Sequence, residues 1–450
     1  MTTGMLEDFL ARIETRDLTV GVVGLGYVGL PLVIGFAEKG YRAVGFDVDA
    51  ERTAALNDGR SHIEDVESTR VRAMVDSGRF LASTKLDDLA RADAVFIAVP
   101  TPFDEAKTPD LTFVRSATEA VRDVLAPGKL VILQSTTFPG TTSEVVRPIL
   151  ESTGLRAGAD FLLAFSPERV DPGNEVWNLR NTPKVVGGID AASGHAAAAL
   201  LQSAMDEPGL ITQLSSPEAA ELTKLLENTF RAVNIALVNE LAVLCDSMDI
   251  DVWEVIDGAA TKPFGFQAFY PGIGPGGHCI PVDPYYLSWR AKVFDFQTKF
   301  IELAADLNLS MADYVRRRVG RMLNDDGKAL SGANVLCYGA SFKPSVSDMR
   351  NSRAVRVIEL LAEAGANVSY HDPRVPTITF GHEGRLRSDL CGTQLKSVDL
   401  TPETVDGADI VVVLVNHPEL GGGEALSGAR RVFDAVNALH QPSDDRVERL

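Results

Sequence analysis

The 450-residue chain has little positive charge and few cysteines. Its 43 Lys and Arg stand against 62 Asp and Glu, and the net charge of −19 argues against general binding to nucleic acid or to anionic membranes. The four cysteines, Cys245, Cys279, Cys337 and Cys391, lie far apart, and none forms a C-x-x-C pair. This pattern predicts a reduced, cytoplasmic protein and excludes a disulfide framework and a zinc ribbon.

Targeting signals, membrane spans and repeats are missing as well. The N-terminal segment carries Glu7, Asp8, Arg12 and Glu14 and lacks the apolar core of a signal peptide. No apolar run approaches the length of a membrane span, and no repeat with a period of about 20–50 residues is visible. The length predicts two or three domains. From the charge, the lack of apolar runs and the cysteine pattern, we expect no nucleic-acid partner, no membrane partner and no metal.

A strand, a glycine turn, a helix, a second strand and an acid follow one another near the N-terminus. Thr19–Val23 is a predicted strand, G-L-G-Y-V-G follows it, and the next strand, Tyr41–Phe46, leads to Asp47. This is the dinucleotide fingerprint in its required context. The pyrophosphate rests on the helix N-terminus, and Asp47 accepts from a ribose hydroxyl and repels a 2′-phosphate, which predicts NAD and not NADP. The turn residues expected at the cofactor are Gly24, Gly26, Tyr27, Val28 and Gly29.

Further buried strands end in polar loops. We expect strands at Asp93–Val99, Leu130–Leu133 and Leu162–Phe165, and loops at the carboxyl ends of such strands line the ligand crevice of a doubly wound sheet. The candidates in these loops are Thr101, Ser135, Thr136, Thr137, Glu168 and Arg169, of which Thr101, Ser135 and Thr136 are expected at the cofactor. For Thr101 a plain turn is the alternative, and for Glu168 with Arg169 a solvated salt bridge. Lys184–Val186 is expected to add an edge strand.

From Ser215 the pattern becomes that of a long helix. S-S-P-E is a helix start, and apolar residues then recur at steps of three and four. They are Leu222, Leu226, Phe230, Val233, Leu237, Leu241 and Leu244. The spacing predicts a helix of about eight or nine turns that joins two domains and forms a subunit interface. Lys224 and Asn228 lie one turn apart on its other face, where a lysine is ordinarily solvated.

One cysteine lies in a glycine-rich loop. The segment G-P-G-G-H-C-I-P-V-D-P-Y-Y places Cys279 after two glycines and before Asp283. Glycines admit a ligand, and a thiol there can attack a carbonyl carbon, although a buried structural cysteine is the alternative. Together with an NAD fold, the loop favours oxidation through a thioester, which water then hydrolyses. Lys224 would hold the oxyanion, and Asp283 would orient water or take a proton.

Helix is expected around Val252–Ala260 and again from Tyr285 to about Asn324, before the last third alternates between strand and helix. The strands Asn334–Tyr338, Asn367–Tyr370 and Ile410–Val415 predict a second, smaller α/β domain. Its first turn, G-A-S-F-K-P, lacks the three-glycine fingerprint, so no second dinucleotide is assigned. In this region Lys343 and Arg350 are candidates for anion binding.

Six motifs together resemble the nucleotide-sugar 6-dehydrogenases of the UDP-glucose/GDP-mannose dehydrogenase family. They are V-G-L-G-Y-V-G-L-P-L, S-T-T-F-P-G-T-T, A-F-S-P-E-R-V-D-P-G-N, A-E-L-T-K-L-L-E-N, G-G-H-C-I-P-V-D-P and F-K-P-S-V-S-D-M-R, and the resemblance runs from about Val20 to Asn437. The expected fold class is α/β, with two Rossmann-like doubly wound domains joined by a long central helix. The expected parts are an NAD-binding domain (1–212), a central helical and dimerisation region with the cysteine loop (213–328), and a UDP-sugar-binding domain (329–450).

The resemblance also implies an activity and roles for single residues. The activity is four-electron oxidation of a sugar C6 alcohol to a carboxylate with two NAD, in a homodimer built on the long helix. Cys279 matches the nucleophile, with Lys224, Asn228 and Asp283 around the reacting carbon. Thr136 and Glu168 match positions that handle water and protons, and Arg52 and Arg350 match cofactor-side positions. The substrate contacts implied are Glu168, Arg169, Lys224, Asn228, Gly276, Phe342 and Lys343.

Two loops narrow the substrate within the family. E-R-V-D-P-G-N and G-G-H-C-I-P-V-D-P-Y-Y look most like the UDP-N-acetylglucosamine 6-dehydrogenases. The UDP-N-acetylmannosamine branch, which is similar, usually has Leu where Asp171 stands and Ala where Pro281 stands. UDP-N-acetylglucosamine is therefore the expected substrate, with UDP-N-acetylmannosamine and UDP-glucose as alternatives.

The chain departs from the family pattern at several positions. Where the family reads R-E-S-P, this chain reads R-N-S-R, so Asn351 and Arg353 differ from the pattern. Ser345 stands in place of an aspartate, and Val436 in place of an arginine. If the family's arginine makes a charge-assisted hydrogen bond to the substrate, its loss lowers the binding free energy by about 1.5–3 kcal/mol. Two alternatives follow: a catalytically reduced paralogue that binds NAD or a nucleotide sugar as a regulatory subunit, and a two-electron hydroxyacid dehydrogenase that needs no cysteine.

Overall fold

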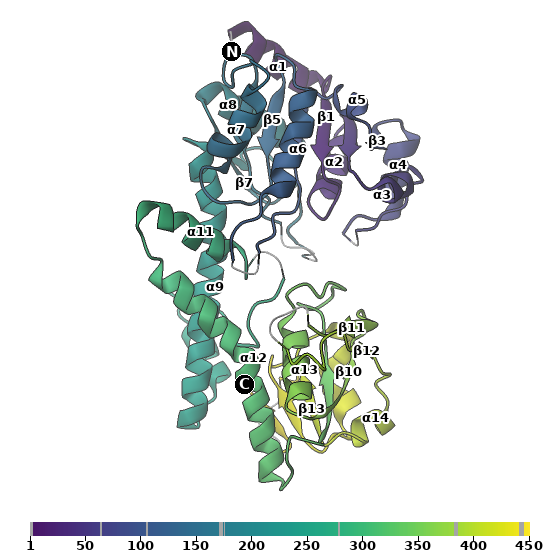
Figure 1. Ribbon diagram of the computed structural model, residues 1–450, viewed down its shortest axis with the longest axis vertical. Coiled ribbons are helices and arrows are strands. Elements are labelled where there is room, and N and C mark those ends of the chain that lie inside the picture. The colour runs from purple at the N-terminus through teal and green to yellow at the C-terminus, as the bar shows by residue number, and fades with distance from the viewer. Residues whose placement is uncertain are drawn as a thin grey trace. The chain divides into compact units, whose positions relative to one another are not determined.

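The computed structural model describes residues 3–63, 65–104, 107–170, 174, 176–277, 280–381, 386–440 and 445–450. The chain divides into two compact units. Unit 1 comprises Met1–Glu227 and Trp289–Asp295, and unit 2 comprises Asn228–Ser288 and Phe296–Leu450. The long helix α9 (Pro217–Met248) begins in unit 1 and continues in unit 2 (Figure 1).

Unit 1 contains a largely parallel sheet. Its described strands form one eight-stranded sheet in the order β3-β2-β1-β4-β5-β6-β7-β8, and the β6–β7 pair is antiparallel. The strands are β1 (Thr19–Val23), β2 (Arg42–Phe46), β3 (Phe80–Ser83), β4 (Ala94–Ile97), β5 (Leu130–Leu133), β6 (Leu162–Phe165), β7 (Lys184–Gly188) and β8 (Ile211–Leu214). The strand order reverses between β1 and β4, which is the doubly wound arrangement that the sequence predicts.

Helices cover both faces of this sheet because successive strand residues point to opposite sides. Phe96 packs with one set of helices, including α2, and its neighbours Val95 and Ile97 pack with α5, α6 and α7. The helices of this unit are α1 (Thr3–Thr15), α2 (Gly29–Glu38), α3 (Ala50–Asn57), α4 (Ser68–Asp76), α5 (Leu86–Leu89), α6 (Thr112–Asp123), η1 (Thr142–Val146), α7 (Arg147–Glu151), α8 (Ala191–Ala204) and η2 (Lys292–Phe294).

Unit 2 contains a smaller parallel sheet in the order β10-β9-β13-β14-β15, together with a two-stranded antiparallel sheet of β11 and β12. Its strands are β9 (Asn334–Tyr338), β10 (Asn367–His371), β11 (Thr377–Thr379), β12 (Gln394–Lys396), β13 (Ile410–Val413), β14 (Val432–Asp434) and β15 (Val447–Arg449). Its helices are α10 (Val252–Ala260), α12 (Lys299–Asp325), α13 (Arg353–Glu363), α14 (Pro402–Asp406) and η3 (Pro418–Leu426), while α11 (Asp283–Ala291) ends in unit 1.

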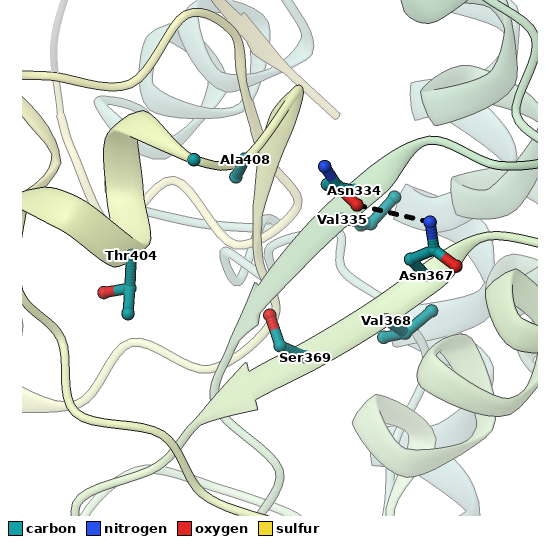
Figure 2. A pocket seen from close by; sticks show the side chains of 8 residues that line it. Asn334, Val335, Asn367, Val368, Ser369, Thr404 and Ala408 are labelled. Carbon is teal, nitrogen blue, oxygen red and sulfur yellow. Dashed lines mark hydrogen bonds between the residues drawn. The ribbon is translucent and has the colours of Figure 1, made fainter.

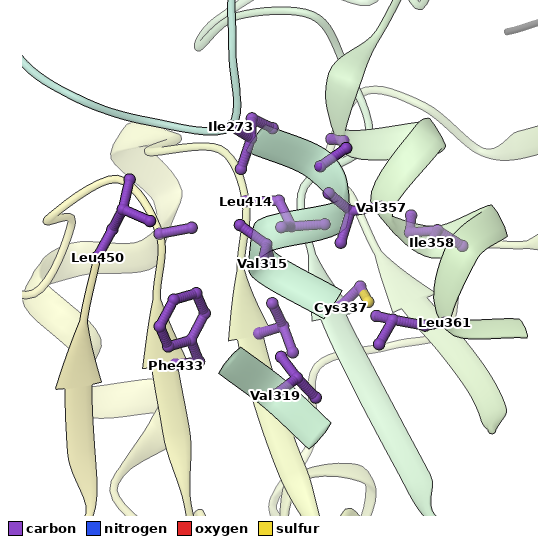
Figure 3. Close-up of a cluster of buried hydrophobic side chains, with 14 of the residues drawn as sticks. Ile273, Val315, Val319, Cys337, Val357, Ile358, Leu361, Leu414, Phe433 and Leu450 are labelled. Atoms are coloured by element: carbon purple, nitrogen blue, oxygen red, sulfur yellow. The ribbon is translucent and has the colours of Figure 1, made fainter. Parts of the chain in front are cut away.

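The core of unit 2 shows the same alternation. Cys337 packs with Val315 and Val319 of α12 and with Ile358 of α13, as Figure 3 shows. The adjacent Leu336 faces the opposite side, where α14 and η3 contribute Val405, Leu420 and Leu426. Each unit therefore has its own apolar core around its own parallel sheet, which confirms the predicted α/β class.

The structure corrects two sequence-based expectations about elements. Lys184–Val186 was expected at the sheet edge, but β7 lies between β6 and β8, and β8 forms the edge. The pattern of β8 is weak because its four residues are only partly buried or exposed. The helix expected from Tyr285 to about Asn324 is broken into α11, η2 and α12, with a left-handed residue at Asp295 (φ 54°).

Candidate active site

The turn between β1 and α2 has the shape that a dinucleotide requires. Gly24 adopts φ +93°, and a Cβ there would lie 2.4 Å from the Ala98 carbonyl oxygen. Gly29 packs just as tightly on Gly24, whereas a Cβ at Gly26 would meet open space. The start of α2 at Val28 has no side-chain cap. The residues thus fit a pyrophosphate on the N-terminus of α2, with Tyr27 partly exposed beside it.

Asp47 lies at the end of β2, where a ribose would be recognised. Its Oδ2 accepts from the Leu25 backbone N–H at 2.8 Å and from Arg52 Nη1 at 2.9 Å. The carboxylate therefore organises the glycine turn and also fixes Arg52. Asp47 and Arg52, both expected at the cofactor, therefore form an ion pair with each other.

Hydroxyl residues lie at the ends of β4 and β5. Ser135 Oγ donates to the Val99 carbonyl oxygen at 2.8 Å and accepts from the Val99 N–H at 2.9 Å. This hydroxyl ties the two strand ends together. Thr136, next to it, is half-buried, and Thr101 follows β4 at the same edge. Thr137 is fully buried, and its Oγ1 has no hydrogen-bond partner among the residues described.

Glu168 is buried after β6 within a set of donors. Lys184 Nζ lies 3.2 Å from both of its carboxylate oxygens, and Gln134 Nε2 donates to Oε2 at 3.0 Å. The backbone N–H groups of Arg169 and Val170 donate to Oε1. Burial by itself raises the pKa of Glu168, but Lys184 and these N–H groups hold it below its usual range. Glu168 is therefore a carboxylate, suited to accept a hydrogen bond from water or substrate.

Arg169 and Lys224 lie near the start of α9 in unit 1. Arg169 forms an ion pair with Glu227 at 2.7 Å and donates to the Pro183 carbonyl oxygen. The Lys224 side chain is buried, and its ammonium has no hydrogen-bond or ion-pair partner within the described ranges. An ammonium on a largely buried side chain, with no protein partner in the described part of the chain, is suited to an anionic or polarised oxygen of a ligand.

Asn228 and Asp283 meet inside unit 2. The Asn228 Nδ2 donates to Asp283 Oδ2 at 2.5 Å, and both residues are buried. They are 55 residues apart in sequence, so the fold brings two of the candidate catalytic residues together as expected. Asp283 begins α11, directly after the loop that carries the candidate nucleophile. Cys279 itself, with His278, lies outside the described residues.

The glycine loop before Cys279 packs on the loop after β9. A Cβ at Gly276 would lie 2.9 Å from Phe342 Cβ, and one at Gly277 (φ +83°) would lie 3.0 Å from the Phe342 ring. Asn351 Nδ2 donates to the Gly277 carbonyl oxygen at 3.0 Å, and Gly277 N–H donates to the Arg350 carbonyl oxygen at 3.2 Å. The glycines are required for this close packing, and Asn351, a departure from the family pattern, contributes to it.

Lys343 and Arg350, the anion-binding candidates, lie on the same loop region. Arg350 forms an ion pair with Asp348 at 2.6 Å, and Lys343 Nζ lies 5.9 Å from the centre of the Phe342 ring. Arg353, another departure, donates from Nη2 to the Leu309 carbonyl oxygen of α12 at 2.8 Å. Around Val436, the Asp434 carboxylate accepts from the N–H groups of Val436, Ala438 and Leu439.

A buried Ser341, Asp372 and His417 cluster anchors the loop after β9. Asp372 Oδ2 and Ser341 Oγ both lie 3.2 Å from His417 Nε2, and Ser345 N–H donates to Nδ1 at 3.4 Å. Burial by itself raises the pKa of Asp372, but His417 and the Ala340 N–H hold it down to about 2. A hydrolase triad needs acid and hydroxyl on opposite ring nitrogens, so this cluster has a structural role.

A hollow of about 510 Å³ opens elsewhere in unit 2, at the amino ends of β9 and β10 (Figure 2). Its lining residues are Asn334, Val335, Asn367, Val368, Ser369, Thr404, Gly407 and Ala408. Asn367 Nδ2 donates to Asn334 Oδ1 at 3.3 Å. Ligands of parallel sheets bind at the carboxyl ends of the strands, which for β9 is the edge of Ser341 to Lys343. The hollow is therefore not the candidate site.

The other cysteines do not offer an activated thiol. Cys245 and Cys337 are buried, and burial raises the pKa of Cys337 far above its ordinary value. Cys391 is exposed. Among the residues that the structure describes, no group of three or more His, Cys, Asp and Glu is arranged to hold a metal ion. In the same part of the chain, no helix is both long and apolar enough to cross a bilayer.

Sequence reasoning missed several residues that shape these sites. Lys184, Gln134 and Glu221 are fully or almost fully buried and hydrogen-bonded. A lysine that opens an otherwise apolar strand, K-V-V-G-G, is a usable signal, because buried lysines are rare unless paired. Gln134 and Glu221 carry no comparable signal, since their burial depends on which strands and helices become neighbours.

Three consecutive segments match one family. Residues 18–205 match the NAD binding domain of the UDP-glucose/GDP-mannose dehydrogenase family, residues 218–310 its central domain, and residues 336–441 its UDP binding domain. Together they cover most of the chain.

Individual relatives agree with this match. The chain is 38% identical over 373 residues to the UDP-N-acetyl-D-glucosamine 6-dehydrogenase of Pseudomonas aeruginosa, covering 82% of this chain and 86% of that one. It is 33% identical over 431 residues to the UDP-N-acetyl-D-mannosamine dehydrogenase of Pyrococcus horikoshii, covering 94% and 97%. The solved structure of a UDP-D-ManNAc dehydrogenase from P. horikoshii superposes with a TM-score of 0.84 at 32% identity, covering 96% of this chain and 99% of that chain.

Proposed function

The chain belongs to the UDP-glucose/GDP-mannose dehydrogenase family, and from this premise we propose that it oxidises the C6 hydroxymethyl group of UDP-N-acetylglucosamine to a carboxylate. Members of this family are NAD-dependent UDP-sugar dehydrogenases, so the chain is an NAD-dependent oxidoreductase. The observation that carries the chemistry is the buried contact of Asn228 with Asp283, which begins α11 right after the cysteine loop.

NAD is held in this proposal by the glycine turn and by Asp47 with Arg52. When bound, the cofactor accepts a hydride from the substrate carbon. The contribution of the chain would be to orient the dinucleotide: the uncapped start of α2 would hold the pyrophosphate, and the Asp47 carboxylate, which accepts from the Leu25 N–H, would also accept from a ribose hydroxyl. Ser135 holds the ends of β4 and β5 at the fixed spacing that the crevice needs.

The four-electron oxidation then divides into two hydride losses with a covalent stage between them. Loss of a hydride and a proton turns the C6 alcohol into an aldehyde. The Cys279 thiol adds across the aldehyde C=O, a second hydride passes to a second NAD while the hydroxyl proton passes to a base, and a thioester remains. Water hydrolyses the thioester to the acid and returns the thiol.

Four other residues have roles in these steps. Lys224 provides a cation for the C6 oxygen as negative charge develops on it. Asp283, fixed by Asn228, takes the proton from the alcohol or from the hydrolytic water. Glu168 and Thr136 position that water, since Glu168 is held as a carboxylate by Lys184.

The sugar is assigned from two loops. E-R-V-D-P-G-N and G-G-H-C-I-P-V-D-P-Y-Y match the N-acetylglucosamine branch better than the N-acetylmannosamine branch, with Asp171 and Pro281 as the differing positions. Relatives of both kinds are similar to this chain, so the loops and not overall identity support the choice. A panel of UDP-N-acetylglucosamine, UDP-N-acetylmannosamine, UDP-glucose and GDP-mannose tests it. We expect oxidation of the first; oxidation of another would replace the substrate, and binding without oxidation of any would favour a regulatory paralogue.

The proposed assembly is a homodimer through α9. Along this helix Phe230, Leu237, Leu244 and Met248 are 48–57% exposed on one stripe. Contiguous apolar surface of this kind is rare on a monomer and typical of obligate subunit contacts. Leu222, Leu226 and Leu241 extend the stripe.

A further inference from the structure

Glu221 is a fully buried acid near the start of α9. Its Oε2 accepts from the Gly140 N–H at 2.6 Å. Its Oε1 accepts from the Thr142 N–H at 2.9 Å and from the Thr142 hydroxyl at 2.7 Å. Gly140 and Thr142 lie at the end of the loop that follows β5 and enters η1. One carboxyl group therefore joins α9 to this loop, inside unit 1.

The two elements joined by Glu221 each carry a proposed catalytic residue. Lys224 is three residues further along α9, so the two side chains share a helix face. Thr136 lies in the loop, four residues before Gly140. The hydrogen bonds of Glu221 therefore connect the two elements that hold Lys224 and Thr136.

The start of η1 is capped by one acid of α9, Glu221. Its N-cap residue, Thr141, makes no side-chain capping bond, so the Thr142 N–H depends on an acceptor from outside the helix. Glu221 supplies acceptors, and Glu218, one turn earlier, accepts from the Ser143 hydroxyl. The other charged groups around this contact are Lys224 on α9 and the Glu144–Arg290 ion pair beside Gly140.

The carboxyl group of Glu221 can accept from the N–H groups of Gly140 and Thr142 whether it is protonated or ionised. Burial raises the pKa of Glu221 to about 7; the hydrogen bonds from Thr142 and Gly140 act against the rise, and Glu218 adds to it. In the acid form, Oε1 donates its proton to the Thr142 hydroxyl, which accepts as readily as it donates. In the ionised form all three donors point at the carboxylate, and such charge-assisted bonds are the stronger ones.

We infer that Glu221 is a proton-linked positioning residue: its carboxylate holds the Thr136 loop firmly against the Lys224 turn of α9, and its neutral acid holds the loop loosely. The inference rests on the proposed function, because it serves the same reaction. Turnover of the sugar rises with pH through neutrality by about tenfold, since a misplaced catalytic group costs up to about 10²-fold. The KM for NAD changes less than kcat, because the glycine turn and Asp47 are not involved.

The first experiment measures kcat and KM for the sugar between about pH 5.5 and pH 8.5 in four proteins: the wild type, Thr142→Val, Thr142→Ser and Glu218→Gln. Thr142→Val removes a hydrogen bond that lowers the pKa of Glu221, so the inflection in kcat moves to higher pH. Glu218→Gln removes a charge that raises it, so the inflection moves to lower pH, and Thr142→Ser restores the wild-type profile. A structural role alone would not shift the inflection in opposite directions, and two unshifted profiles would overturn the inference.

A second experiment does not depend on turnover. The infrared band of a protonated carboxyl group is followed with pH in the wild type and in Glu221→Gln. A band that disappears near neutral pH in the wild type and is missing from the variant supports the inference; identical spectra overturn it. If the band titrates but no sugar is oxidised, the proposed function fails; if sugar is oxidised without that titration, only the role of Glu221 fails.

Discussion

Asp283 and Asn228, both proposed to be catalytic, form a buried contact within unit 2. The amide of Asn228 donates to Asp283 Oδ2, and this carboxylate is the group proposed to take a proton. At the scale of single residues, the proposed chemistry therefore depends on the charge of Asp283 more than on its shape. An amide in its place keeps the size and removes the base.

The variant Asp283→Asn tests this point. We expect kcat for sugar oxidation to fall about 10²–10⁴-fold, the contribution typical of a positioned acid or base. NAD affinity should stay unchanged, because Asp283 is not among the proposed cofactor contacts. Rapid-mixing absorbance at the NADH band and NAD titration measure the two quantities. Asp313→Asn, on the surface of α12, is the matched control, and wild-type turnover in Asp283→Asn would remove the residue from the mechanism.

Lys184 is the residue that keeps Glu168 ionised while buried. The folded-state pKa of Glu168 is lowered, so its stabilising contribution is complete above the ordinary carboxyl pKa and is lost as the pH falls through the lowered value. Removing the ammonium leaves a buried carboxylate without a cation, and breaking such a pair costs about 3–5 kcal/mol. The cost should shrink in acid, where the carboxyl of the variant takes up a proton.

Urea unfolding of Lys184→Met at pH near 8 and near 5 measures this difference. We expect a loss of about 3–5 kcal/mol at the higher pH and a smaller loss at the lower one. Lys39→Met is the control, because the partly exposed Lys39–Asp206 pair should contribute at most about 1 kcal/mol. An equal loss at both pH values would show that Lys184 stabilises the fold by packing and not by charge.

Single residues differ in how well the sequence predicts their place. Asp47 and the glycine turn follow from spacing alone, because strand, turn and helix are contiguous. The Asn228–Asp283 contact came from the family resemblance, since 55 residues of intervening chain carry no distance information. The Lys184–Glu168 pair depends on β7 running antiparallel beside β6, which no local pattern in the sequence specifies.

At the scale of elements, α9 belongs to both units of the chain. Its first turns belong to unit 1, where Glu221 binds the loop after β5, and its later turns belong to unit 2. Its length was predictable from the three- and four-residue apolar spacing, and its observed range is Pro217–Met248. The same apolar spacing marks both the buried stripe and the exposed one, so sequence alone could not say which leucines stay exposed.

The exposed stripe gives a prediction about assembly. Leu237→Glu places a charge in the middle of the proposed dimer contact, and burying an unpaired charge costs several kcal/mol. We expect the variant to sediment as a monomer at concentrations where the wild type is a dimer. Leu81→Glu, at an exposed position of β3 in unit 1, should leave the dimer intact. A Leu237→Glu protein that remains dimeric would move the interface away from this face of α9.

At the scale of the whole molecule, two parallel sheets with separate cores carry the two nucleotide functions. The sheet of unit 1 matches an NAD binding domain, and the sheet of unit 2 lies in the region that matches a UDP binding domain. Alternating strands and helices predicted both sheets. The strand order within each sheet was not predictable, because buried strands such as β4, β5 and β6 are all uniformly apolar.

The central claim is that one chain takes four electrons from a single sugar carbon through Cys279. The most direct test counts the NADH formed per UDP-N-acetylglucosamine consumed, in the wild type and in Cys279→Ser. The account predicts two NADH and a uronic acid from the wild type, and no acid from the variant. One NADH per sugar, or acid formed undiminished by Cys279→Ser, would contradict it.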